Sequence, residues 1–491
     1  MTRLCDAALA ALPADVGTPG YDRGAHGVGI VHIGVGAFHK AHQAVYTEDA
    51  LATAGGDGRC AGVSRRRPDA EGALAPQDGL YTLVGRHPDG PRAQVIGALA
   101  EVGTAPRDKA RTRALLTAPT TRIVSLTVTE KAYGLDPATG GLDVARADIA
   151  ADLEAPDAPR TAVGWIVHAL ARRRAAGIAP FTPLCCDNLA ENGAMLARLV
   201  RDFAERIDPG LAAWIRAEVP FPSTMVDRIT PASTQETLAD ARRLTGFDDA
   251  AATETEPFSQ WVIEDRFGAG RPAWEAAGAI LASDVRPYEA MKLRLLNGAH
   301  SLIAYAGAVA GLDFVRDVMA RETLAALVAA HQHDVARTLA SVPGVDLATY
   351  RGELRARFAN PAMAHRTVQI AMDGSQKLPP RLLEPALDAI ERGLPWRTCA
   401  FAVAAWMRYL DGRDENGAEL PLCDPLADRL RATLAAAGTD PGERARALLG
   451  LDVVFPPALA RHPGFARAVA EDLARITREG MIPAARAALA G

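Results

Sequence analysis

The feature that most constrains the fold is the segment GIVHIGVGAF, in which an apolar, β-branched run beginning at Gly29 ends in closely spaced glycines. A helical pattern follows over about residues 40–52. A strand, a glycine turn and a helix in this order open a dinucleotide-binding unit. At Gly34 and Gly36 the absent side chain lets the backbone approach a pyrophosphate. His39 takes the third position of the usual G-x-G-x-x-G pattern, so a plain tight turn is the alternative.

The rest of the chain indicates two domains. Short apolar runs lie at 59–64, 81–85, 93–97, 122–129 and 181–187, with helical stretches at 162–176 and 192–207. Strands that alternate with helices predict a mostly parallel α/β sheet. After about Asp284 apolar residues recur at helical spacing, which predicts an all-helical second domain. We therefore expect a dinucleotide-binding domain at 1–283 and a helical substrate domain at 284–491.

Composition narrows the class of protein. A chain of 491 residues is too long for one ordinary core. Its net charge of -5 gives no electrostatic reason to expect nucleic acid or an acidic membrane as partner. The longest apolar run, 302–312, is too short to span a bilayer and predicts a buried helix, and the N-terminus makes a poor signal peptide. The six cysteines lack CxxC spacing, which favours a cytoplasmic location and no zinc site.

Lysine is rare in this chain. Of the 54 cationic residues, the lysines are Lys40, Lys109, Lys131, Lys292 and Lys377. A buried ammonium can lose its proton near neutral pH, whereas a guanidinium cannot. These lysines are therefore better candidates for chemistry than lysines in an average chain.

One of them belongs to the segment YEAMKLRLLNGAHSLIAY. On an ideal α-helix, Lys292, Asn297 and His300 fall at about 0°, 140° and 80°, within one broad face. An amine, an amide and an imidazole can together polarise a carbonyl and exchange its proton. The surrounding leucines indicate a buried helix, which would lower the pKa of the lysine. The alternative is a helix with a polar shoulder.

Two further polar stretches are candidates. Asn188 follows a predicted strand in Cys186-Asp187-Asn188, and the carboxyl ends of parallel strands are where α/β folds place ligands. An N-cap for the next helix is the alternative. Asp227 and Arg228 lie in TMVDRITP, where a surface ion pair is the alternative.

The region after the second predicted strand bears on the choice of cofactor. An acid there binds the ribose 2′-hydroxyl of NAD, whereas an arginine favours the 2′-phosphate of NADP. Arg65, Arg66 and Arg67 occupy the place, and Asp69 is the first carboxylate. The residues thus leave NAD and NADP both open. The histidine pairs 39/42 and 331/333 lack further ligands, so we predict no metal site.

Taken together, these stretches resemble the mannitol dehydrogenase family, the polyol-specific long-chain dehydrogenases. The matching pieces are IVHIGVGAFHKAHQAVY, QDGLYTLV, IVSLTVTEKAYG, CDNLAENG, FPSTMVDRITP, QWVIEDRF, MKLRLLNGAHS and IAMDGSQKLP. They run in one order from about residue 29 to 410. The resemblance implies a Rossmann-type N-terminal domain, an all-helical C-terminal domain and metal-independent hydride transfer between NAD(P) and a sugar-derived alcohol or ketone.

The resemblance also implies roles for single residues. Lys292 matches the general acid/base, Asn188 and Asn297 the amides that hold the substrate oxygen, and His300 the histidine that orients substrate. Asp227 matches a residue of the substrate pocket, and Glu289 the carboxylate that links the lysine to solvent. Gly34, Gly36, Phe38 and Lys40 match the cofactor turn, where position 40 is usually arginine.

Within the family, the segment HRTVQIAMDGSQKLP at 365–379 is most similar to fructuronate reductases (mannonate oxidoreductases). Gln369 stands where the polyol enzymes commonly have arginine. Arg366 or Lys377 is a candidate to pair with a uronate carboxylate. We therefore favour D-fructuronate/D-mannonate as substrates, with mannitol/fructose or another polyol (arabinitol, sorbitol) as the alternative. A non-catalytic nucleotide sensor is a remote alternative, against which the intact catalytic set argues. We expect a monomer or small homo-oligomer.

Overall fold

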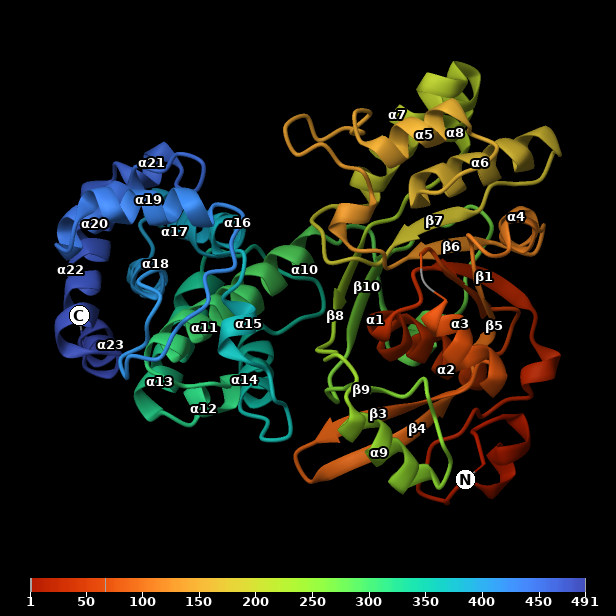
Figure 1. Ribbon diagram of the computed structural model, residues 1–491, viewed down its shortest axis with the longest axis horizontal. Helices are drawn as coiled ribbons and strands as arrows, with labels where there is room; N and C mark the ends of the chain where they lie inside the picture. Colours follow the sequence, from red (N-terminus) through yellow and green to blue (C-terminus); the bar gives the residue numbers. More distant parts are fainter. Residues whose placement is uncertain (1, 67, 491) are drawn as a thin grey trace. The chain divides into compact units, whose positions relative to one another are not determined.

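Two units make up the chain, Met1–Arg286 and Pro287–Gly491, shown from red to green and from green to blue in Figure 1. The computed structural model describes residues 2–66 and 68–490. We still propose that residues 1–283 bind the cofactor. We likewise propose that residues 284–491 bind the substrate.

The first unit is built on a five-stranded parallel sheet with strand order β5-β2-β1-β6-β7. Its strands are β1 (Val28–Ile33), β2 (Arg59–Ser64), β5 (Leu99–Thr104), β6 (Ile123–Leu126) and β7 (Thr182–Cys185). All neighbouring pairs are parallel. The chain adds strands first on one side of β1 and then on the other, so the order reverses between β1 and β6. Ligands of doubly wound sheets bind at such a switch point, beyond the carboxyl ends of the strands. The predicted α/β fold class is confirmed.

Both faces of this sheet are buried, which explains why its strands are near-continuous apolar runs. Val31 and Ile33 of β1 point into a core with the helices α6 (Ala162–Ala175) and α7 (Asn192–Ile207). Ile30 points the other way, into a core with α2 (Gln43–Ala54). The remaining helices of the unit are α1 (Ala37–Ala41), α3 (Asp69–Leu74), α4 (Lys109–Thr117), α5 (Ala147–Glu154), α8 (Pro209–Glu218) and α9 (Gln235–Thr245).

Two of the predicted strands do not join the parallel sheet. The runs at 81–85 and 93–97 become β3 (Tyr81–His87) and β4 (Gly90–Ile96), which pair antiparallel. Only two residues connect them, and a parallel crossover needs a dozen or more, so these strands can only form a hairpin. β9 (Thr253–Thr255) joins β3, and a third sheet has the order β11-β10-β8. Its strands are β8 (Thr224–Asp227), β10 (Gln260–Glu264) and β11 (Ile280–Ala282).

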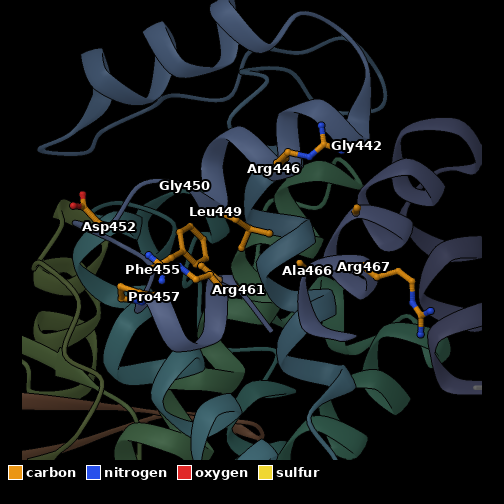
Figure 2. Close-up of a pocket in the computed structure, with 12 residues that line it drawn as sticks. Gly442, Arg446, Leu449, Gly450, Asp452, Phe455, Pro457, Arg461, Ala466 and Arg467 are labelled. Atoms are coloured by element: carbon orange, nitrogen blue, oxygen red, sulfur yellow. The ribbon is translucent and has the colours of Figure 1, made fainter. Parts of the chain in front are cut away.

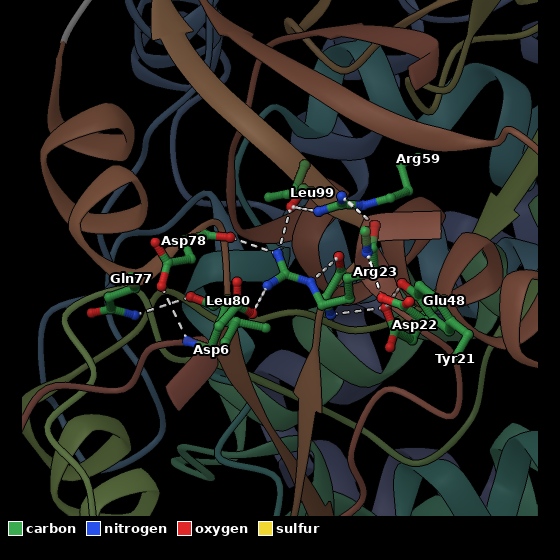
Figure 3. A network of polar contacts seen from close by, with 12 residues as sticks. Asp6, Tyr21, Asp22, Arg23, Glu48, Arg59, Gln77, Asp78, Leu80 and Leu99 are labelled. Atoms are coloured by element: carbon green, nitrogen blue, oxygen red, sulfur yellow. Dashed lines mark hydrogen bonds and ion pairs between the residues drawn. The ribbon is translucent and has the colours of Figure 1, made fainter. Parts of the chain in front are cut away.

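A polar network holds the N-terminal residues of the first unit, which include Asp6, Tyr21 and Arg23, against the rest of that unit (Figure 3). Buried Arg23 donates hydrogen bonds to the carbonyls of Gly97 at 3.0 Å and Leu99 at 3.1 Å. Glu48, whose exposed fraction is 2%, accepts from the amide of Gly97 at 2.8 Å and from the hydroxyl of Tyr21 at 2.9 Å. Buried groups thus take part in holding these N-terminal residues.

Helices joined by loops make up the described residues of the second unit, and none of these residues forms a strand of a sheet, as predicted. Its elements are α10 (Arg286–Met291), η6 (Lys292–Gly298), α11 (Ala299–Val309), α12 (Val315–Met319), α13 (Glu322–Ala336), α14 (Leu347–Phe358), α15 (Thr367–Ile370), α16 (Gly374–Leu378), η7 (Pro379–Leu383), α17 (Glu384–Glu391), α18 (Arg397–Tyr409), α19 (Ala427–Ala437), α20 (Pro441–Leu449), α21 (Pro457–Ala460), α22 (Pro463–Glu479) and α23 (Met481–Ala490). The segments η6 and η7 are π-helical. Every residue of α11 is buried, as the apolar run at 302–312 predicts. Within 2–66 and 68–490, no helix is long and apolar enough to cross a membrane.

Candidate active site

The turn after β1 can hold a phosphate. Gly34 has φ +103°, and a Cβ there would lie 2.2 Å from the carbonyl oxygen of Thr127, so only glycine fits. Gly36 is exposed and begins α1 as its N-cap. A Cβ on Gly36 would meet only the carbonyl oxygen of Gly34, at 3.8 Å. The space over Gly36 is therefore left to a ligand, as the approach of a pyrophosphate requires.

A pair of histidines fills the place of the third glycine. The ring of His39 in α1 stacks on that of His32 in β1, with centroids 3.4 Å apart and planes 10° apart. His32 is held by the hydroxyls of Ser125 at 2.8 Å and Thr127 at 3.0 Å. His39 is fully buried. In this chain stacked imidazoles thus make the close helix–strand contact that a third glycine usually allows. Over residues 2–66 and 68–490, no group of three or more His, Cys, Asp or Glu side chains is arranged to hold a metal ion.

Phe38 and Lys40 lie on the same short helix. The ring of Phe38 stacks on that of His42, with centroids 5.0 Å apart. The Lys40 ammonium donates to the carbonyl of Ala251 at 2.5 Å and lies 5.4 Å from the ring centroid of Tyr81. Burial lowers the pKa of Lys40 to about 8. Phe38 thus packs against a neighbouring ring and Lys40 presents a cation with a lowered pKa, and the cofactor contacts of both stay predictions.

Two cavities of the first unit contain the predicted cofactor residues. The first, of about 390 Å³ and here named the Asp69 cavity, is lined by Gly36, Lys40 and Asp69 among others. The second, of about 580 Å³ and here named the Arg65 cavity, is lined by Arg65, Arg66, Lys109 and Arg160 with Asp148 as its carboxylate. Burial, and next the charge of Arg66, lowers the pKa of Arg65. The structure thus places the acid and the arginines in different cavities. Arg67 lies outside the described residues.

Asp187 joins the ends of two neighbouring parallel strands. Its carboxylate accepts from the amides of Val128 at 2.9 Å and Thr129 at 3.2 Å, and from the hydroxyl of Tyr133 at 2.6 Å. Thr129 has φ +70°, a strained value for a β-branched residue, and such strain gathers at functional sites. The N-cap of α7 is Glu191, so the Asp187 side chain is not that cap. Asn188 follows, exposed at the carboxyl end of β7.

Asp227 ends β8 and is 5% exposed. Its neighbour Arg228 donates to the carbonyls of Ala41 at 2.6 Å and Glu256 at 3.2 Å. The position is buried, so a surface ion pair does not describe it.

The lysine segment differs from the expected α-helix. Between α10 and α11 the chain is π-helical over Lys292–Gly298. A π-turn closes by an i→i+5 hydrogen bond, so residues 292 and 297 lie about one turn apart on one face, not about 140° around a helix. His300 follows Asn297 by three residues, in the first turn of α11, which keeps it on that side of the helix. Lys292 is 7% exposed, His300 6%, and Asn297 is half-buried. Glu289 lies half-buried on α10, three residues before the lysine.

The two π-helical segments pack against each other at Gly298. A Cβ there would lie 2.9 Å from the carbonyl oxygen of Arg381 in η7 and 3.1 Å from Nε2 of His331 in α13. The distance to the backbone carbonyl is too short for a Cβ unless the backbone shifts, and the distance to His331 is tight. The glycine thus allows the close contact that holds η6 in place.

His300 lies among aromatic and cationic groups. Its ring centroid is 4.6 Å from that of Phe358 and 5.5 Å from that of His365. Its buried Nε2 has no hydrogen-bond partner among the described residues. Burial holds the pKa of His300 well below 6.5, helped by the charges of His365, Arg357, Arg381 and Lys292. The imidazole is therefore neutral at physiological pH, with one nitrogen left for a ligand.

The two cations expected to bind a carboxylate differ in setting. Lys377 is half-buried and donates to the carbonyl of Ile370 at 3.2 Å, and burial followed by the charge of Arg381 lowers its pKa. The Arg366 side chain is 56% exposed and lies 3.7 Å from the carboxylate of Asp313. Sequence reasoning missed Arg381, although it follows Lys377 by four residues and so shares its helix face.

A further cavity of the second unit, of about 450 Å³, contains none of the predicted site residues (Figure 2). Its floor includes Phe455 and Leu449, and arginines stand at its rim. Two of these arginines form ion pairs with carboxylates of their own helices. Arg446 lies 2.6 Å from Glu443, and Arg467 lies 3.8 Å from Glu471.

Family models match both units. A model described as the mannitol dehydrogenase Rossmann domain matches residues 28–276, and one described as the mannitol dehydrogenase C-terminal domain matches residues 284–477.

Individual proteins are similar over nearly the whole chain. A D-mannonate oxidoreductase of Escherichia coli is 41% identical over 98% of this chain and 98% of its own. A mannitol 2-dehydrogenase of Aspergillus terreus is 38% identical over 95% and 94%. The structure of Pseudomonas fluorescens mannitol 2-dehydrogenase in ternary complex with NAD and D-mannitol is 37% identical, covers 100% of both chains and has a TM-score of 0.86.

Proposed function

The chain belongs to the mannitol dehydrogenase family, and from that membership we propose an NAD(P)-dependent oxidoreductase that interconverts a secondary alcohol and a ketone on a six-carbon sugar derivative. D-Fructuronate and D-mannonate are the proposed substrate pair. The observation that carries the proposal is the polar face of Lys292, Asn297 and His300, which runs from a π-helical segment into the buried helix α11. π-Turns of this kind are frequent at functional sites.

In the proposed reaction Lys292 gives a proton to the substrate oxygen during reduction and takes it back during oxidation. Asn297, about one π-turn away, donates its amide to the same oxygen. His300 is neutral because of its lowered pKa, so its free Nε2 can donate or accept a hydrogen bond to a substrate hydroxyl. Glu289, one turn before the lysine, exchanges the proton with solvent. The roles of Asn188 as a second amide and of Asp227 as a pocket residue rest on the family resemblance.

The nicotinamide cofactor supplies or accepts the hydride. Gly34 and Gly36 fit its pyrophosphate, because one position admits only glycine and the other leaves its space open. The Pseudomonas enzyme was solved with NAD, which supports NAD here. The arginines that line the Arg65 cavity favour NADP as a further cofactor, because guanidinium groups suit a 2′-phosphate.

The hexonate pair is favoured over mannitol and fructose because half-buried Lys377 offers a cation to a carboxylate. Arg366, paired at long range with Asp313, is the other candidate cation. Mannitol 2-dehydrogenase activity, or activity on sorbitol or arabinitol, is the alternative, since an A. terreus mannitol 2-dehydrogenase is 38% identical. We further propose a cytoplasmic protein that works as a monomer or small homo-oligomer on small-molecule substrates.

An absorbance assay tests the proposal. Purified protein with NADH and D-fructuronate should consume NADH, and with NAD and D-mannonate should produce it. D-Fructose, D-mannitol, D-sorbitol and D-arabinitol are the comparison substrates. A higher kcat/KM for fructose than for fructuronate would overturn the hexonate proposal in favour of the polyol one. No turnover with any of them, at saturating cofactor, would favour the non-catalytic alternative.

A further inference from the structure

Cationic side chains act on the buried imidazole of His300 in the second unit. The depressed pKa of His300 has burial as its first cause and cationic neighbours as the rest, Arg381 among them. Lys377 and Arg381 are neighbours as well, since the charge of Arg381 lowers the pKa of Lys377. The carboxylates of Asp373 and Asp424 lie near Lys377. The Asp424 carboxylate already accepts hydrogen bonds from the hydroxyl of Ser375 at 2.5 Å and from its amide at 2.8 Å.

Arg381 is the least satisfied of these cations. It is half-buried, and its guanidinium has five N–H donors. Within the described residues it makes no ion pair, and its side chain makes one long hydrogen bond, to the hydroxyl of Ser301 at 3.3 Å. A desolvated charge without a partner is costly, so such groups are usually paired with an anion.

The backbone of Arg381 is also fixed close to the catalytic segment. Its carbonyl oxygen lies against Gly298, where a Cβ would be 2.9 Å away. Ser301, which its guanidinium contacts, is the residue after His300. Arg381 and the lysine segment are therefore positioned together, one on each of two packed π-helical turns.

We propose that Arg381 is the specificity-determining residue that binds the carboxylate of an anionic ketose or hexonate, with Lys377 beside it. A guanidinium matches a carboxylate through two parallel N–H···O bonds, whereas an ammonium acts as a point charge. The inference rests on the proposed function and deepens it, because it names the group that tells a uronate from a neutral sugar.

The test compares D-fructuronate with D-fructose, which differ in a carboxylate against a CH₂OH group. Arg381→Gln should raise KM for fructuronate by roughly tenfold or more, the loss expected for a charge-assisted pair, and change kcat/KM for fructose by less than about threefold. Arg294→Gln is the control, because Arg294 lies on the other π segment, η6, and pairs with Asp388 at 2.5 Å. This control variant should lower the thermal stability of the protein. It should leave the ratio of kcat/KM for fructuronate to kcat/KM for fructose unchanged.

Two further measurements keep the test decisive. Arg381→Lys retains the charge and should keep part of the fructuronate preference even if Arg381→Gln folds poorly. D-Mannonate, titrated by calorimetry without cofactor, should bind the parent and bind Arg381→Gln at least tenfold more weakly. A parent that prefers fructose overturns the substrate proposal and this inference with it. A parent that prefers fructuronate, with that preference intact in both Arg381 variants, overturns the role of Arg381 alone.

Discussion

At the scale of single residues, Lys292 is the side chain on which the chemistry depends. Lys292→Ala should leave cofactor affinity near normal and lower kcat by two to four orders of magnitude, the usual effect of removing a general acid/base. Stopped-flow and steady-state assays with NADH and the preferred ketone measure the loss, and fluorescence titration with NADH checks binding. Small primary amines should restore part of the rate. A variant that keeps more than about a tenth of the parental kcat would show that the lysine is structural.

Cofactor choice is a second question at this scale. Arg65 lines one cavity and Asp69 the other, so their effects should separate. Arg65→Ala should lower kcat/KM with NADPH by roughly tenfold and change that with NADH by less than about threefold, because only the 2′-phosphate needs the cation. Asp69→Ser should lower kcat/KM with NADH by roughly tenfold and change that with NADPH by less than about threefold. Failure of the parent to turn over NADPH at all would show that Arg65 points away from the ribose.

Some site residues could be found in the sequence and others could not. Spacing and neighbours single out Lys292 and Asn297, because an amine and an amide in an apolar helix are conspicuous. For Arg381 the spacing of four residues from Lys377 is the one signal, and it is weak in a chain whose cations are nearly all arginine. What sets Arg381 apart is that it pairs with no carboxylate of residues 2–66 and 68–490, and a sequence cannot show this. In the sequence, His39 only makes the glycine motif incomplete. Its stacking on His32 is visible only in the structure.

At the scale of elements, the strand–turn–helix order and the switch to helices after residue 284 follow from apolar periodicity. The π-helical segment does not, because leucines at 293, 295 and 296 bury equally well on an α- or a π-turn. What selects the wider turn is the packing of η6 on η7, which is tertiary. The expected angle of about 140° between Lys292 and Asn297 was wrong for this reason.

That packing can be tested at Gly298. In an ordinary helix Gly→Ala stabilises by about 0.5–1 kcal/mol. Gly298→Ala should instead destabilise the protein by about 1–3 kcal/mol, because its Cβ would meet the Arg381 carbonyl at 2.9 Å. It should also lower kcat, since the lysine segment must shift. Denaturant unfolding and steady-state kinetics measure the two effects.

Gly352→Ala on α14 is the matched control. A Cβ there meets nothing within 4 Å, so this variant should gain stability and keep its activity. Equal stability changes in the two variants would mean that η6 and η7 are not held together at Gly298.

At the scale of the whole molecule, stability also depends on groups that have no proposed role in the chemistry, and the network around Glu48 shows how (Figure 3). Burial raises the pKa of Glu48 from 4.5 to about 7, against the opposing hydrogen bonds from Gly97 and Tyr21. An acid with a raised pKa contributes its stability below the unfolded pKa and loses it as pH rises through the folded value. Between about pH 4.5 and 7 this group should therefore cost on the order of 2–4 kcal/mol.

Glu48→Gln isolates that contribution, because glutamine keeps an oxygen for the Gly97 amide and the Tyr21 hydroxyl but never ionises. At pH 5 the carboxyl is protonated in the folded protein, and the variant and parent should melt at similar temperatures. At pH 8 the parent must hold a buried carboxylate, so the variant should melt several degrees higher. Calorimetric scans of both proteins from pH 5 to 8 measure the difference, which should grow mainly between pH 5 and 7 and then level off. A difference that is constant with pH, or that favours the parent at pH 8, would show that Glu48 is ionised in the folded protein and that its charge is stabilised by Arg23.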